Sequence, residues 1–244
     1  ADHWLSKKSL SLKYGWYGIL IIFIFFLGIK TKSQVDVWQD SESLWTQALQ
    51  YYPNEDLILA NRGNHRGKTG NIKGAMSDFE VAIADGCDRA DVYEGLGNSY
   101  GTMSEQQPEN KNEYIGKAIS MFNKALELDP ENGQVRYNLG VAQLQTNPAA
   151  SEIAFKEALK RMPYKEANIL PVLGLSQLNS GNYLEAIKTL TKVIESGKAT
   201  DAVFYHRGLA NLGVGNRESA KNDFDQALAI NPGNADVKAR LAAM

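Results

Sequence analysis

The sequence has little of the chemistry that catalytic and metal-binding sites usually need. Cys87 is the single cysteine among 244 residues, which excludes an intrachain disulfide framework. The three histidines, His3, His65 and His206, lie at no spacing that metal ligands use. Nucleophile elbows, phosphate-binding loops and paired-carboxylate motifs are also missing from the sequence. We therefore expect no metal, no cofactor and no catalytic residue in this chain.

The sequence also has no large excess of positive or negative charge. Lys and Arg number 26 against 28 Asp and Glu, for a net charge of -2, and both signs are spread along the sequence. Such a balance provides no electrostatic footprint for nucleic acid. Since 43% of the residues are hydrophobic, the chain can bury a core and belongs to the folded class.

One long apolar run stands near the start of the chain. Sixteen residues without a charge, from Tyr14 to Ile29, lie between Lys13 and Lys30, and three aromatic residues open the run. A helix of this length covers roughly 24 Å of a hydrocarbon core of about 30 Å, and the flanking lysines can extend it. We predict a membrane anchor at residues 1–33 with a span at about 13–30, in contact with the lipid bilayer.

Two other interpretations of this run are weaker. A secretory signal peptide would end at a small-residue cleavage site, but the run ends in "LGIKTKSQ". A buried core helix would need a large domain around it, and nothing upstream in the chain supplies one.

The flanking charges predict the orientation. Three lysines precede the run and two follow it, so we expect the N-terminus in the cytoplasm and the rest of the chain on the other side of the membrane, which in a bacterium is the periplasm. The first residue is Ala1 and not Met, and we expect the chain to be processed or part of a longer protein.

The remainder of the chain repeats itself with a period of 34 residues. A recurring glycine marks each repeat, at Gly63, Gly97, Gly140, Gly174 and Gly208. About twelve residues later a small residue follows, and four residues beyond it comes a bulky apolar one, at Phe79, Phe122, Phe155, Leu190 and Phe224. Six spaced positions recur together in register across residues 56–234.

This pattern resembles the tetratricopeptide repeat family, whose unit is a helix, a turn and a second helix. The resemblance implies an all-α, right-handed superhelical solenoid of antiparallel helix pairs, in which the bulky apolar residues pack between repeats. We expect five repeats followed by a capping helix at 235–244; the repeats are 56–89, 90–132, 133–165, 166–200 and 201–234.

A half repeat precedes the first full one, at residues 34–55. Counting back one period from Ala75 and Phe79 gives Ser41 and Trp45 in "VDVWQDSESLWTQALQYYPN". We therefore predict that Trp38 to Tyr52 is a second helix without its first, and that Trp38 and Trp45 belong to the inter-repeat packing.

The same junction resembles a narrower group, the multi-pass bacterial membrane proteins of the glycosyltransferase type with C-terminal tetratricopeptide repeats. This likeness covers about 30 residues. It implies that the chain is the C-terminal part of a larger protein whose multi-pass membrane region carries out the catalysis.

The second repeat contains about nine extra residues, within 101–114, which are polar and include Pro108. We expect them to form a longer turn between the two helices; the alternative is a loop that contacts a partner.

Membership of the tetratricopeptide family would imply a concave groove, lined by the first helices, that holds a peptide. Amide side chains there can both donate to and accept from a peptide backbone. The candidates for this groove are Asn61, Asn64, Asn98, Tyr137, Asn138, Leu175, His206 and Leu209. We predict a membrane-tethered scaffold that binds protein or peptide partners; the alternative is an accessory domain that presents acceptor polypeptide to a membrane glycosyltransferase.

Overall fold

The computed structural model describes residues 2–244, with side chains from Gly15 onward. These residues form thirteen α-helices and two short 3₁₀ helices, and there is no strand in the part described. The expected all-α fold is confirmed. The helices are α1 (Asp2–Val37), α2 (Ser41–Tyr51), α3 (Asp56–Lys68), α4 (Ile72–Ala84), α5 (Ala90–Gln106), α6 (Lys111–Leu128), α7 (Gly133–Gln143), α8 (Pro148–Arg161), α9 (Glu166–Asn179), α10 (Tyr183–Glu195), α11 (Asp201–Gly213), α12 (Arg217–Ile230) and α13 (Ala235–Ala242), with 3₁₀ turns at Pro108–Asn110 and Pro163–Lys165.

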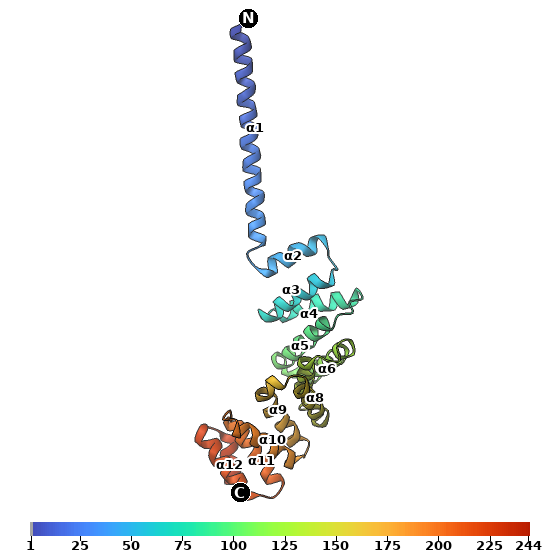
Figure 1. The fold of residues 1–244 in the computed structure, drawn as a ribbon, viewed down its shortest axis with the longest axis vertical. Helices are drawn as coiled ribbons and strands as arrows, with labels where there is room; N and C mark the ends of the chain where they lie inside the picture. Colours follow the sequence, from blue (N-terminus) through green and yellow to red (C-terminus); the bar gives the residue numbers. More distant parts are fainter. Residues whose placement is uncertain (1) are drawn as a thin grey trace.

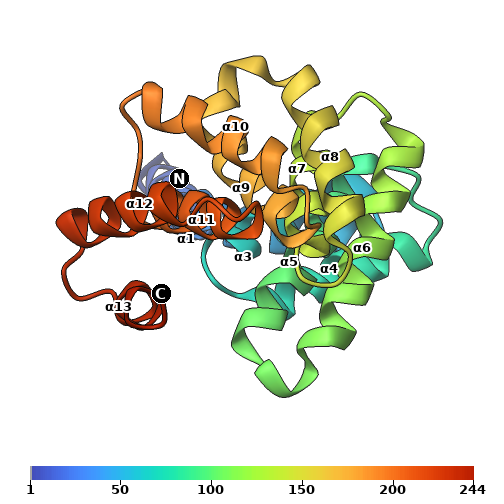
Figure 2. The same cartoon turned by 90° about the horizontal axis from the view of Figure 1, so that it is seen from below.

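From α3 to α12 the helices form five pairs, one in each of the expected repeats. Each helix packs mainly on the helix before it and the helix after it, and several first helices also contact the first helix of the next repeat. The pairs therefore stack into an elongated solenoid that ends at α13 (Figure 1). Seen along its length, the stack turns progressively about its long axis (Figure 2).

Close approach of the two helices in each pair depends on a glycine. A Cβ atom at Gly140 would lie 2.8 Å from Cε1 of Phe155, which is closer than real Cβ contacts come. The corresponding glycine of every other repeat meets the bulky residue of its own second helix in the same way. These bulky residues are almost completely buried, with exposed fractions of 1% for Phe79, 3% for Phe122 and 0% for Phe155, Leu190 and Phe224. Phe79 also lies against Gly95 of the next repeat, so its ring joins two repeats.

The half repeat differs from its prediction at Trp38. Helix α2 begins at Ser41 because Asp40 caps it, accepting a hydrogen bond of 2.7 Å from the backbone N–H of Ser43. Trp38 therefore lies in the turn before α2, where its side chain is 70% exposed, and it packs in no repeat. α1 continues through Val37, so the boundary expected at residue 34 falls inside a helix.

The link between α1 and α2 differs from the three-residue turns inside the repeats. Three residues separate the helices of the first, fourth and fifth pairs, and the central one is a glycine with positive φ: Gly70, Gly181 and Gly215. Three residues also separate α1 from α2, but the central one is Gln39, and no non-glycine residue has positive φ in the part described. The link between α1 and α2 thus lacks the left-handed residue that these three-residue turns use. α1 extends away from the solenoid as a straight rod (Figure 1).

The extra residues of the second repeat do not form the expected longer turn or loop. They lengthen both helices, so that α5 has 17 residues and α6 has 18. The extension has a core of its own: the rings of Tyr100 and Tyr114 stack with centroids 6.2 Å apart, and Lys117 lies over both. Pro108 is confined to the short 3₁₀ turn that joins the two helices.

Buried ion pairs link the two helices of the first and last repeats. Arg62 donates to Asp78, 16 residues later, with Nη2 to Oδ1 at 2.7 Å, and Arg207 donates to Asp223 with the same spacing. The two aspartates are only 2% and 1% exposed. Each arginine also donates to a threonine 16 residues before it, so the pair fixes three successive helices.

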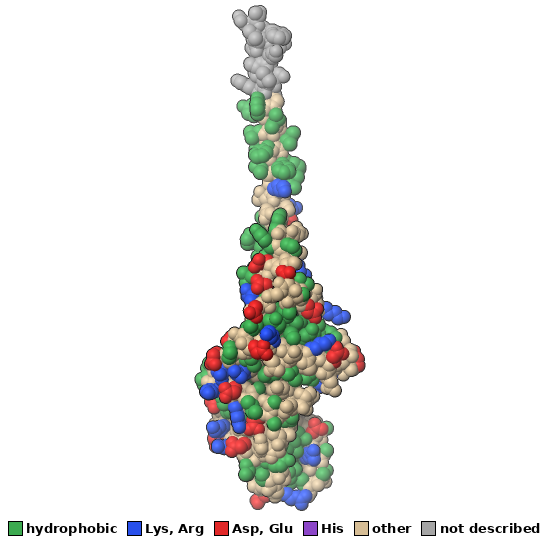
Figure 3. All heavy atoms as spheres, turned by 90° about the vertical axis from the view of Figure 1, so that its right-hand side faces the viewer, with side chains coloured by type: hydrophobic (Ala, Val, Ile, Leu, Met, Phe, Trp, Pro, Cys, Tyr) green, Lys and Arg blue, Asp and Glu red, His purple; other side chains and the backbone are tan. Residues whose placement is uncertain are grey.

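The described part of α1 exposes its apolar side chains, and no other described residue covers them (Figure 3). Gly15–Val37 is long and apolar enough to cross a membrane, although a signal sequence would meet the same criterion. Tyr14 and the earlier residues of the predicted anchor lie outside the region whose side chains are described.

The packing of Phe155 can be tested with a matched surface control in the same helix. Phe155→Ala should lower the free energy of unfolding by about 3–5 kcal/mol, because the ring is fully buried against Gly140. Ile153→Ala, at a side chain that is 65% exposed, should change it by less than about 0.5 kcal/mol. Chemical denaturation followed by circular dichroism measures both values, and equal effects would contradict the register of the repeats.

Candidate functional site

Two hollows lie side by side where the first helices of the first three repeats follow one another. The polar hollow, with a volume of about 490 Å³, lies among α2, α3 and α5 and is lined mainly by Trp45, Asn61, Asn64, His65, Glu94 and Asn98. The apolar hollow, of about 540 Å³, lies among α5, α6 and α7 and is lined mainly by Asn98, Ile115, Tyr137, Val141, Ala142 and Leu144. Asn98 lines both, so the two hollows adjoin at this residue, and we refer to them together as the groove.

The polar hollow is rich in amides and contains an unusual carboxylate. Asn61 and Asn64 are half-buried, and neither makes a side-chain hydrogen bond within the described part of the chain. Their amide groups are therefore available to a ligand. Burial raises the pKa of the Glu94 carboxyl, and the carboxylates of Asp91 and Asp129 raise it further, while the amide of Asn132 opposes the shift.

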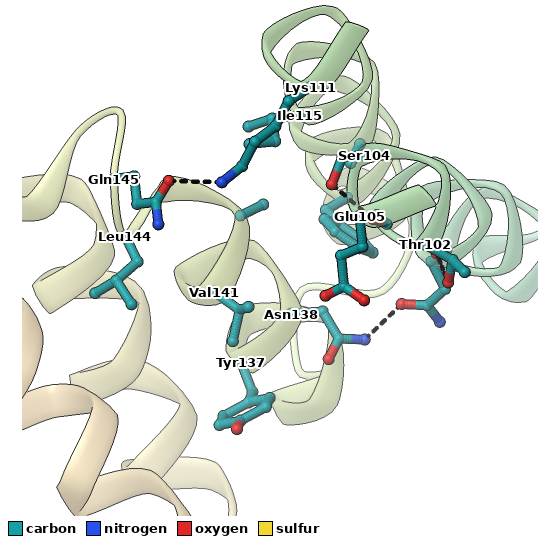
Figure 4. A pocket seen from close by; sticks show the side chains of 15 residues that line it. Thr102, Ser104, Glu105, Lys111, Ile115, Tyr137, Asn138, Val141, Leu144 and Gln145 are labelled. Carbon is teal, nitrogen blue, oxygen red and sulfur yellow. Dashed lines mark hydrogen bonds between the residues drawn. The ribbon is translucent and has the colours of Figure 1, made fainter. Parts of the chain in front are cut away.

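The lengthened second repeat forms one wall of the apolar hollow (Figure 4). Ile115 comes from the longer α6, and Val141 and Leu144 face it from the third repeat. Lys111 donates to Oε1 of Gln145 at 3.0 Å, and this bond joins the extension to the end of α7. The extra residues thus deepen the groove at this point.

A chain of amide hydrogen bonds crosses from one repeat to the next along the groove. Nδ2 of Asn138 donates to Oδ1 of Asn98 at 2.9 Å, and Nε2 of Gln134 donates to Oδ1 of Asn138 at 2.9 Å. Lys165 in turn donates to Gln134 at 2.7 Å. These bonds hold the amides in place before any ligand binds, and they leave the Nδ2 donor of Asn98 directed at no partner in the described region.

Of the eight predicted groove residues, the structure brings five together. Asn61, Asn64, Asn98, Tyr137 and Asn138 line one or both hollows.

The other three lie further along the solenoid and line neither hollow. Leu209 packs with the cluster around Phe224, and Leu175 is half-buried on α9. Burial lowers the pKa of His206, whose ring lies 5.8 Å from that of Tyr205.

Several lining residues were not predicted from the sequence. Trp45 was assigned to packing alone, yet it also lines the polar hollow because α2 has no first helix beside it. Glu94 and Val141 occupy no position that the repeat pattern marks. These two residues lie in the groove because three helices meet there. A pattern within one helix cannot predict such a meeting.

The described residues include no group of three or more His, Cys, Asp or Glu side chains placed to hold a metal ion. Cys87 is buried, and its Sγ lies 3.5 Å from Oδ2 of Asp56. Burial raises the pKa of this thiol, which disfavours the reactive thiolate.

Comparison with known proteins identifies the repeats. Residues 113–166 and 202–234 match models of the tetratricopeptide repeat. No curated protein matches the chain. Among solved structures, YrrB, described as a TPR protein with an unusual peptide-binding site, superposes with a TM-score of 0.71 at 22% identity, over 82% of this chain and 98% of that chain. The MamA protein superposes with a TM-score of 0.62 at 22% identity, over 74% of this chain and 94% of that chain. At these identities the likeness shows the fold.

The raised pKa of Glu94 predicts that the stability of the fold depends on pH. Because its folded-state pKa is raised, Glu94 favours folding most below its unfolded pKa, and this advantage is lost as the pH rises through the folded pKa. Glu94→Gln should therefore raise the melting temperature at pH 7 and change it little below about pH 4. Thermal unfolding by circular dichroism at both pH values measures the difference. A lower melting temperature at pH 7 would mean that the Glu94 carboxylate makes a stabilising contact.

Proposed function

Because the chain carries tetratricopeptide repeats at residues 113–166 and 202–234 and has the fold of such proteins, we propose that it is a scaffold that binds polypeptide partners in the groove between its first helices. The observation that supports this most directly is the pair of hollows that adjoin at Asn98. The groove is the place where the chain combines depth, available amides and uncovered apolar surface.

An extended polypeptide suits this groove better than a compact small molecule. The hollows follow one another along the solenoid, so that a ligand filling both must span neighbouring repeats. The amides of Asn61, Asn64 and Asn98 can satisfy peptide N–H and C=O groups that would otherwise be left to water. The hydrogen bond between Asn98 and Asn138 holds both side chains in place before binding and so reduces the conformational entropy that binding costs.

We also propose that α1 tethers the scaffold to a membrane. Gly15–Val37 spans about 35 Å as a helix, enough to cross a hydrocarbon core of about 30 Å. Its exposed apolar side chains have no protein cover in the part of the chain described, and lipid is the environment that such a surface favours. The lysine count around the span favours repeats on the extracytoplasmic side.

The role as an accessory domain of a membrane glycosyltransferase is the second candidate. It rests on the resemblance of the junction around Trp45 alone, and it would place the polar hollow near the membrane region of a multi-pass parent. The coding sequence upstream of Ala1 tests it directly: a series of hydrophobic spans there would support this role, and a nearby start codon would exclude it.

Replacing Asn98 tests whether the groove binds peptides. Peptides from a randomised library can be selected on the full chain in detergent and their affinities measured by fluorescence anisotropy. Asn98→Ala should weaken a selected peptide about tenfold, since one or two hydrogen bonds worth about 0.5–1.5 kcal/mol each are lost. Asn222→Ala, at an exposed position on α12, should leave the affinity unchanged. If the library yields no binder above background, the proposed function is wrong.

The membrane tether can be tested with charges placed in α1. Ile22 and Phe25 are 71% and 70% exposed, and replacing both by Asp should cost about 5 kcal/mol or more in a bilayer. The double variant should move from the carbonate-washed membrane pellet to the soluble fraction. The control pair Gln39→Asp and Gln50→Asp, at exposed positions outside Gly15–Val37, should stay with the pellet. A wild-type chain in the soluble fraction would refute the tether.

A further inference from the structure

We infer that the groove selects a partner segment with a lysine or arginine in the polar hollow and an apolar side chain in the apolar hollow, about three residues apart. This inference rests on the proposed function and names the class of peptide that the groove binds. The inference is based on three features of the groove: Trp45, Glu94 and the exposed apolar surface around Val141.

Trp45 is more exposed than the bulky residues at the same position of the five full repeats. Its counterpart Phe79 is 1% exposed because the first helix of its own repeat covers it with Gly63. α2 has no such helix, since α1 leads away from it, so Trp45 is only half-buried and lines the polar hollow. The face of an indole ring is the aromatic surface that attracts a cation most strongly.

Glu94 lies in the same hollow and has no ion-pair partner among the residues described. The neighbouring carboxylate of Asp91 is already paired with Arg89, at 2.8 Å. A half-buried carboxylate without a cation is unfavourable, and an incoming ammonium or guanidinium group would compensate it. The exposed Lys68 and the half-buried His65 also line this hollow; the long Lys68 side chain can extend into solvent as a cation enters.

The neighbouring hollow offers more apolar than polar surface, although Glu105 and Lys111 also line it. Val141 is 47% exposed although apolar, and Ile115, Ala142 and Leu144 surround it. The hydrogen bond between Lys111 and Gln145 bounds this hollow on the side of the lengthened repeat (Figure 4). An aliphatic or aromatic side chain would remove this apolar surface from water. The exposed carboxylate of Glu105, which also lines this hollow, would repel an acidic side chain there (Figure 4).

The distance between the hollows sets the spacing in the partner. They lie on either side of α5, and packed helix axes are about 8–10 Å apart. An extended chain advances about 3.3–3.6 Å per residue, so about three residues separate the two side chains. Asn98, between the hollows, lies where it can meet the backbone of the intervening residues.

The experiment is a selection from a randomised peptide library on the full chain in detergent, repeated with Glu94→Lys. The wild type should enrich peptides in which Lys or Arg stands about three residues from an aliphatic or aromatic residue. Glu94→Lys should weaken the enriched peptides by about tenfold or more and should itself enrich Asp or Glu at the basic position. Glu218→Lys, an exposed carboxylate on α12, is the charge-matched control and should retain the wild-type preference.

Two further variants separate recognition from folding. Glu94→Gln removes the charge with little change of shape. It should weaken the binding of basic peptides and leave the preference for an apolar residue in the apolar hollow unchanged. Val141→Asp should remove the apolar preference and keep the basic one. Binders that lack the basic and apolar pair, or equal behaviour of Glu94→Lys and Glu218→Lys, would overturn this inference and leave the proposed function standing. Failure of the wild type to enrich any peptide would overturn both.

Discussion

The contact between a glycine of the first helix and a bulky apolar side chain of the second is the constraint on which this molecule depends. Where Phe155 meets Gly140, any larger residue on the first helix would force the pair apart. The contact buries one face of each first helix against its partner and leaves the opposite face uncovered. A solenoid built from such pairs therefore has a groove along its first helices as a geometric consequence, before any residue there is selected for binding.

The half repeat lacks this contact, and its structure differs accordingly. α2 carries Ser41 and Trp45 at the positions that are fully buried in complete repeats, but the helix before it is directed elsewhere. Gln39 stands where the equivalent three-residue turns have glycine, and α1 extends away from α2 (Figure 1), so the face of α2 remains open. One turn thus has two effects: it exposes α1 for a membrane, and it exposes Trp45 to the groove.

The sequence predicted the features that every repeat shares, and failed where a single helix departs from the pattern. Phe79 and Phe224 could be placed because the same spacing recurs around them. Trp38 could not, because counting back one period ignores the cap that Asp40 provides. The polar segment 101–114 suggested a loop, yet the stacking of Tyr100 on Tyr114 makes it helical, and such a contact between residues of two helices has no signature within either. The amides of the groove could be predicted because they share one face of their own helices. That Glu94 has no ion-pair partner could not be predicted, because it depends on which residues of other helices lie nearby.

The position of the groove relative to the anchor limits how a partner can approach. The polar hollow is built partly on α2, the first helix after α1, whereas the apolar hollow lies one repeat further from the anchor. If α1 crosses a bilayer, a bound segment must run outward from the membrane surface, with its basic residue nearer to the lipid. Anionic headgroups would attract the same basic residue and would compete with Glu94 for it when the partner is unbound. Release from the lipid surface and capture by the groove would then be linked steps, and the affinity measured in neutral detergent would exceed that on an anionic membrane.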